Sequence, residues 1–147
     1  MLSKNYLEIY AKSFNWAGFF LPKKTYKQCS VLYDFCRVAD NIADDENKIE
    51  VKKNNFIKFR NNFINKNYDD PVIKNMWDLM NEFNISRKIV DDLLEGINSD
   101  IKEVVKLNSK KEILIYSYRV AGTVGLMMAK IMNLSLIHIS EPTRRLR

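Results

Sequence analysis

Apolar side chains recur every three or four residues along most of this chain, the spacing of one face of an α-helix. In residues 48–65, for example, Phe56, Phe59 and Phe63 follow this spacing and are expected to face a core. Residues that interrupt helices are scarce, because the 147 residues include only 4 Gly and 3 Pro. No segment alternates apolar and polar residues as a half-buried strand does. The sequence therefore predicts an all-α protein, and its length suits one domain.

Capping and turn residues divide the chain into six expected helices. In order, these are about residues 3–20, about 22–45, about 48–65, one that begins at Asp70-Pro71 and continues through Phe83, one from Ser86 through Ile101, and one that begins at Ser109. Ser109 and Glu112 form the S-x-x-E pattern of a capping box.

Cys29 and Cys36 lie on one expected helix, about 10 Å apart along its axis. That separation is too large for a disulfide.

The charge pattern bears on partners and location. The chain has 24 Lys+Arg and 18 Asp+Glu, a net charge of +6. The lysines are scattered rather than gathered on one face, so a solvated surface is expected and no nucleic-acid partner.

The amino terminus lacks a signal peptide pattern. In the apolar stretch 113–139, Arg119 and Lys130 leave ten uncharged residues between them, about half of a bilayer span. We expect a cytoplasmic protein and leave peripheral membrane association open.

The last residues differ in composition from the rest. The first 143 residues contain four arginines and the last four contain three, and the one histidine, His138, also lies near the end. The segment 134–147 resembles translated sequencing-adapter DNA. We therefore expect residues 1–133 to form the domain and 134–147 to add nothing to fold or function, so histidine chemistry is not expected.

The expected helix over residues 22–45 carries a line of polar groups beside its apolar face. At about 100° per residue, Tyr33, Arg37, Asp40 and Asp44 share a narrow arc, which we call the polar stripe. Carboxylates at i,i+4 repel each other unless a cation or a proton lies between them. Mg²⁺ binds through one or two carboxylates and keeps other positions for water and phosphate oxygens. The stripe favours a magnesium site, and the alternative is a solvated surface pair, since the chain has four acid pairs at this spacing.

Three segments resemble the phytoene and squalene synthases, the head-to-head trans-isoprenyl diphosphate synthases. The polar stripe matches, position by position, their first aspartate-rich motif, Y-x-x-x-R-x-x-D-x-x-x-D. LLEGINSDI, from Leu93 to Ile101, is similar to L-x-E-G-x-x-x-D-I/L, and YSYRVAGTVGLMM, from Tyr116 to Met128, is similar to Y-x-Y-x-V-A-G-T-V-G. The three segments occur in the family's order within about residues 10–133, and the phytoene branch is the closer likeness.

The resemblance implies an isoprenoid-synthase-type helical bundle. It implies a prenyltransferase of carotenoid or related isoprenoid biosynthesis that condenses two prenyl diphosphates head to head through a cyclopropylcarbinyl diphosphate. In the phytoene branch the substrate is geranylgeranyl diphosphate. Mg²⁺, or Mn²⁺ in its place, neutralises the leaving diphosphate, and a dry apolar cavity protects the allylic cation from water.

The resemblance also assigns roles to residues. Asp40 and Asp44 would hold the metal, and together with Arg37 they are the expected catalytic residues. Arg37 and Tyr33 would contact the diphosphate, with Ser13 at its edge.

Further along the chain, the resemblance implies that Tyr116 and Val120 face the substrate cavity. Helical geometry agrees, because these two residues, Thr123 and Met127 fall within about 60° of one another. A buried core helix without a substrate is the alternative. Small residues on the opposite side are expected to let another helix approach closely; they are Ala121, Gly122 and Gly125.

One part of the family pattern has no counterpart here. The family uses a second aspartate-rich motif on a later helix, and this chain resembles only the amino-terminal half. We therefore expect a truncated bundle without turnover of its own. A squalene or dehydrosqualene synthase-like enzyme, a non-catalytic helical scaffold and a basic nucleic-acid binder stay open as alternatives. The sequence does not indicate the oligomeric state.

Overall fold

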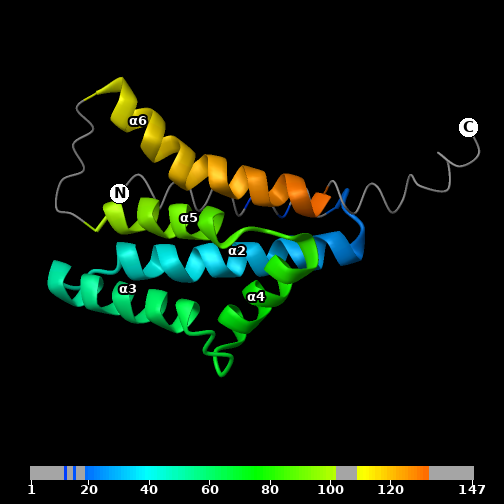
Figure 1. The fold of residues 1–147 in the computed structure, drawn as a ribbon, viewed down its shortest axis with the longest axis horizontal. Coiled ribbons are helices and arrows are strands. Elements are labelled where there is room, and N and C mark those ends of the chain that lie inside the picture. The colour runs from blue at the N-terminus through cyan, green and yellow to red at the C-terminus, as the bar shows by residue number, and fades with distance from the viewer. Residues whose placement is uncertain (1–11, 13–14, 16–18, 102–108, 133–147) are drawn as a thin grey trace, which may run out of the picture.

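The computed structural model describes residues 12, 15, 19–101 and 109–132, and within these residues the chain is helical and has no strand (Figure 1). The elements with defined bounds are α2 (Lys23–Asp44), α3 (Ile49–Ile64), α4 (Pro71–Phe83), α5 (Arg87–Ser99), α6 (Lys110–Ser117) and the π-helix η1 (Tyr118–Gly122). An α-helix resumes over residues 123–132. The predicted all-α class is confirmed.

Helix α2 is the centre of the bundle and contacts α3, α4 and α5. Helices α2 and α5 run in the same direction, so their carboxyl ends lie at the same end of the bundle (Figure 1). Helix α6, η1 and residues 123–132 form one rod that runs in the opposite direction, and η1 packs against α5. This arrangement brings the end of α2, the end of α5 and the rod together.

Aromatic side chains form much of the core between α2, α3 and α4. The ring of Phe35 lies 5.4 Å from that of Phe59 and 5.3 Å from that of Phe63, measured between centroids. Phe63 stacks on Trp77 at 4.9 Å, and the Trp77 indole N–H donates a 2.9 Å hydrogen bond to the carbonyl oxygen of Phe63. Phe56, Phe59 and Phe63 are all buried. The prediction that this stripe faces a core is confirmed.

The helices begin where side chains can satisfy their first backbone N–H groups. The Asp70 carboxylate accepts from the N–H of Val72 at 3.0 Å, and Pro71 occupies the first turn of α4. The hydroxyls of Ser86 and Ser109 accept from the third residue beyond them, at 3.4 Å and 3.1 Å. The predicted starts of α4, α5 and α6 are confirmed. The expected helix over residues 3–20 lies almost entirely outside the described residues.

Replacing the cap residue Asp70 with Ala should lower the free energy of unfolding by about 1 kcal/mol. The substitution removes the acceptor for the Val72 N–H at the start of α4. Urea denaturation followed by circular dichroism measures the change. The neighbouring Asp69→Ala variant is the matched control, because Asp69 is exposed and does not cap the helix. Equal losses in both variants would show that the cap contributes nothing.

The helix that begins at Ser109 continues as predicted over the described residues, with one π-helical turn, η1, in the middle. Among the described residues, no other helix closely approaches the small residues expected to allow it: nothing described lies within 4 Å of a Cβ added at Gly125, and a Cβ added at Gly122 would meet Tyr118 of its own helix. Among the described glycines, Gly96 of α5 makes the close approach to a neighbouring helix.

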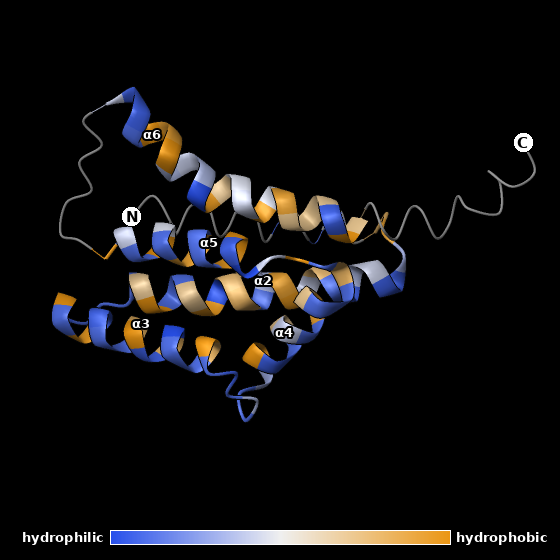
Figure 2. Cartoon of the chain, viewed as in Figure 1, coloured by the Kyte–Doolittle hydropathy of each residue, from blue (hydrophilic) through white to orange (hydrophobic). Residues whose placement is uncertain are grey.

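The rod carries many hydrophobic residues (Figure 2), and several of them are exposed. Leu114 is 69% exposed, and Ile113 and Leu126 are each 46% exposed. No helix in the described part of the chain is both long and apolar enough to cross a membrane. Both cysteines are free, as expected.

Candidate functional site

The polar stripe lies along α2, between its packed face and solvent. Asp40 and Asp44 are half-buried near the carboxyl end of the helix. Tyr33 is also half-buried, and Arg37 is exposed. Directly beside the stripe, the apolar side of α2 is in the core, where Phe35 and other residues of the helix are fully buried. The carboxylates therefore lie at the edge of a desolvated region. Ser13 lies outside the described residues.

A third carboxylate, Asp100, joins the pair from another helix. Asp100 is the C-cap residue of α5, and α5 ends at the same end of the bundle as α2 (Figure 1). Its charge acts on Asp40, and the charge of Asp44 acts on both. Sequence reasoning gives Asp100 no role, although the residue stands in the L-x-E-G-x-x-x-D segment. Its proximity to Asp40 and Asp44 depends on tertiary packing.

Tyr116 reaches the same place from α6. Its hydroxyl donates to Asp100 and lies 2.8 Å from Oδ1 and 3.0 Å from Oδ2. The structure thus brings together Asp40, Asp44, Asp100 and Tyr116, which we call the acidic end. Val120, one turn further along, lies in η1 and packs toward Gly96 of α5.

At the acidic end, burial and neighbouring carboxylates disfavour the ionised form of Asp40 and Asp100. Burial raises the pKa of Asp40 to about 7, and the charges of Asp44 and Asp100 add to the rise. Burial also raises the pKa of Asp100; the hydrogen bond from Tyr116 offsets part of the rise, and the Asp44 charge adds to it. Burial and the bond to Asp100 raise the pKa of Tyr116, as do the three carboxylate charges. A bound cation would therefore stabilise the ionised carboxylates.

Cys36 lies on α2 near Asp40, and its thiol is held in the protonated form. Burial and the charge of Asp40 raise the pKa of its thiol to about 12. The side chain is therefore protonated at neutral pH, and the thiolate is the reactive form.

The chemistry of the donor set suits a hard divalent cation. Asp40 and Asp44 supply carboxylate oxygens one helical turn apart, and burial and the neighbouring carboxylates disfavour the ionised form of Asp40. Among the described residues, no three acidic, histidine or cysteine side chains lie close enough to hold a metal ion by themselves. Mg²⁺ does not require such a cage, because it commonly binds through one or two carboxylates and takes its other ligands from water and substrate phosphate.

A separate groove of about 370 Å³ lies between α2 and α4. Its lining includes Lys24 and Lys27 near the start of α2, and Asp78 and Glu82 of α4. None of the predicted site residues is among those that line it. The groove is therefore distinct from the acidic end.

Comparison with known proteins identifies the family of this chain. The family model for squalene/phytoene synthase matches residues 7–145. The chain belongs to the squalene/phytoene synthase family. The match continues through most of the segment 134–147, whose separate character stays a prediction.

Curated members of the squalene/phytoene synthase family are similar over most of this chain. Phytoene synthase 1, chloroplastic, of Zea mays is 27% identical over 134 residues, which cover 87% of this chain and 32% of the maize protein. The 15-cis-phytoene synthase of Pantoea ananas is 28% identical, covering 83% and 43%. The 4,4'-diapophytoene synthase of Staphylococcus haemolyticus is 26% identical, covering 84% and 44%. The chain thus spans between about a third and somewhat under half of their length.

Proposed function

We propose that this chain forms the first aspartate-rich wall of a magnesium-dependent prenyltransferase that condenses two molecules of geranylgeranyl diphosphate head to head. The observation that carries the proposal is the acidic end, where the charges of carboxylates on α2 and α5 act on one another and the Tyr116 hydroxyl donates a hydrogen bond to Asp100. Family membership supports the reaction class. The names of the maize and Pantoea relatives favour phytoene as the product.

Each residue of the polar stripe has a task in this proposal. Asp40 and Asp44 would hold Mg²⁺, which supplies positive charge to the departing diphosphate. Arg37 and Tyr33 lie on the same stripe toward the start of α2 and would donate hydrogen bonds to the diphosphate oxygens. The partly desolvated position of Asp40 makes such charge interactions stronger than they are in bulk water.

Asp100 and Tyr116 have a different task. Because the Tyr116 hydroxyl donates a hydrogen bond to Asp100, its oxygen lone pairs stay available and its orientation is fixed. The ring can then form one wall of the space beside the carboxylates, while the proton stays on the tyrosine over the physiological pH range, as its raised pKa requires. Burial of this kind excludes water from a reactive carbocation.

A chimeric enzyme tests the proposal. Residues 7–133 of this chain would replace the matching part of the Pantoea ananas enzyme, and the purified chimera would receive geranylgeranyl diphosphate and Mg²⁺. We expect phytoene as the product and no product in excess chelator. The Pantoea parent is the positive control. A folded chimera without product would contradict the proposal, and a preference for a shorter prenyl diphosphate would favour the diapophytoene-type alternative.

A further inference from the structure

The π-helix η1 changes the direction in which α6 presents its side chains. A π-turn contains one residue more than an α-turn, so it rotates the helix before it relative to the helix after it by about 100°. After η1, Thr123, Met127 and Ile131 form one fully buried stripe. Before η1, Tyr116 is turned toward Asp100. An uninterrupted α-helix would place Tyr116 and Thr123 almost on the same face.

The π-turn lies against a glycine that leaves no room for a side chain. A Cβ added at Gly96 of α5 would lie 2.7 Å from Cβ of Arg119, 3.2 Å from the backbone carbon of Arg119 and 3.1 Å from Cγ2 of Val120. Both neighbours belong to η1. Because backbone and Cβ atoms are involved, rotation of a side chain cannot relieve the contact.

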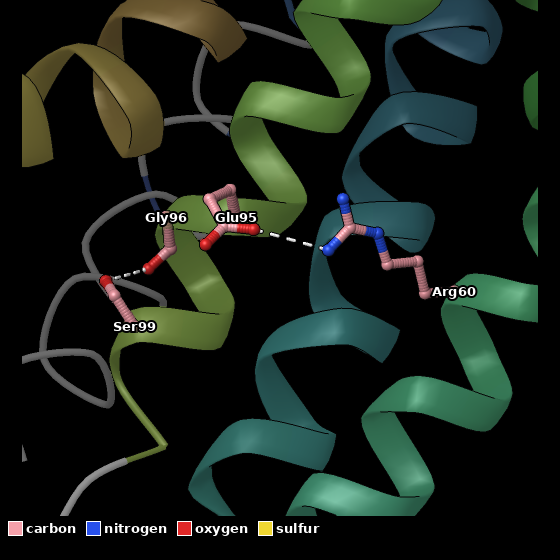
Figure 3. A network of polar contacts seen from close by, with 4 residues as sticks. All are labelled: Arg60, Glu95, Gly96 and Ser99. Atoms are coloured by element: carbon pink, nitrogen blue, oxygen red, sulfur yellow. Dashed lines mark hydrogen bonds and ion pairs between the residues drawn. The ribbon is translucent and has the colours of Figure 1, made fainter.

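Helix α5 packs against α2 and α3 as well as against η1. The carboxylate of Glu95 extends toward α3, where it lies 3.3 Å from Arg60 (Figure 3). Within α5, the hydroxyl of Ser99 donates a 2.6 Å hydrogen bond to the carbonyl oxygen of Gly96 (Figure 3). Because α5 has these other helices as partners, we expect a side chain at residue 96 to displace the π-turn rather than α5.

We propose that Gly96 is a positioning residue that seats the π-turn of η1 against α5 and thereby directs the hydroxyl of Tyr116 to Asp100. The importance of Tyr116 for catalysis rests on the proposed function, but the seating of the turn does not. The proposal assigns Gly96 no contact with the carboxylates of the polar stripe. Its effect on Tyr116 is indirect, because it sets the position of Arg119 and Val120 and with it the rotation of the helix that carries Tyr116.

Carbon-13 NMR of this chain, labelled at tyrosine Cζ, tests the proposal without substrate or metal. Tyr116→Phe assigns the Tyr116 resonance, and Asp100→Ala gives its position without the hydrogen bond. We expect Gly96→Ala to move the Tyr116 resonance to the Asp100→Ala position and to leave Tyr26 and Tyr68, which lie outside η1, in place. Gly125→Ala is the matched control, because a Cβ there meets nothing described within 4 Å.

A compensating variant separates positioning from general destabilisation. Gly96→Ala combined with Arg119→Gly removes the shortest contact, at 2.7 Å, and leaves those at 3.1 Å and 3.2 Å, so it should return the Tyr116 resonance part of the way. This double variant also decides the matter if Gly96→Ala alone does not fold. An unmoved resonance in Gly96→Ala, or no recovery in the double variant, overturns the proposal. A chimera without turnover would overturn the proposed function and leave this result standing.

Discussion

Replacing Asp40 or Asp44 with Asn should lower the turnover of the chimeric enzyme at least about 100-fold, which is about 2.7 kcal/mol of transition-state stabilisation. Asn keeps the size of the side chain but removes the charge that Mg²⁺ requires from its ligands. The diphosphate would then leave without full neutralisation of its developing charge. Steady-state kinetics with geranylgeranyl diphosphate measures the loss, and helical circular dichroism should stay nearly unchanged.

Asp34→Asn is the matched control for these variants. Asp34 lies on α2 but is exposed and outside the polar stripe, so its replacement should change turnover by less than the assay error. If Asp34→Asn lowered turnover as much as Asp40→Asn, removal of any negative charge on α2 would explain the loss, and the polar stripe would have no special role. Full turnover in excess chelator would contradict the role of the metal.

Local features of the sequence predict most of the fold. Asp70, Ser86 and Ser109 cap the helices whose starts they predict. Helix α2 ends at Asp44, one residue from the expected end. These features depend on neighbours within one or two turns, so they can be derived from spacing and side-chain chemistry alone.

The parts that the sequence does not predict depend on contacts between distant residues. The π-turn lies against Gly96, more than twenty residues earlier in the chain. Periodicity shows which face of a helix is apolar, but it does not show which glycine of another helix will meet it. For this reason the sequence favours Ala121, Gly122 and Gly125 for the close approach, and not Gly96.

The candidate site divides in the same way. The spacing of Asp40 and Asp44 on one helix is visible in the sequence, and the structure keeps the pair together on one side of α2. Asp100 joins them only because α2 and α5 end side by side, and its bond to Tyr116 links residues of two helices. The pKa of Asp40 consequently reflects an environment that no single helix creates.

Asp40 should make the chain less stable as the pH rises from about 4 to about 7. Its carboxyl has an ordinary pKa of 3.8, which burial, Asp44 and Asp100 raise to about 7 in the folded chain. Between these values the folded chain keeps a proton that the unfolded chain has released, so stability falls with rising pH. The loss is about 1.4 kcal/mol for each pH unit that separates the folded pKa from the unfolded pKa. The pKa of Asp100 is also raised, so it acts in the same direction.

The difference in melting temperature between Asp40→Asn and the unchanged chain isolates this effect from the other carboxylates. We expect almost no difference near pH 4, and a variant that melts on the order of 10 °C higher at pH 8, since about 1 kcal/mol corresponds to a few degrees in a chain of this size. Asp34→Asn, on the exposed side of α2, is the matched control for the loss of one carboxylate. At pH 8, Mg²⁺ should raise the melting temperature of the unchanged chain and not that of Asp40→Asn, because the cation replaces the proton between the carboxylates. A difference that is constant with pH, or one that grows toward acid, would mean that Asp40 is ionised in the folded chain throughout this range.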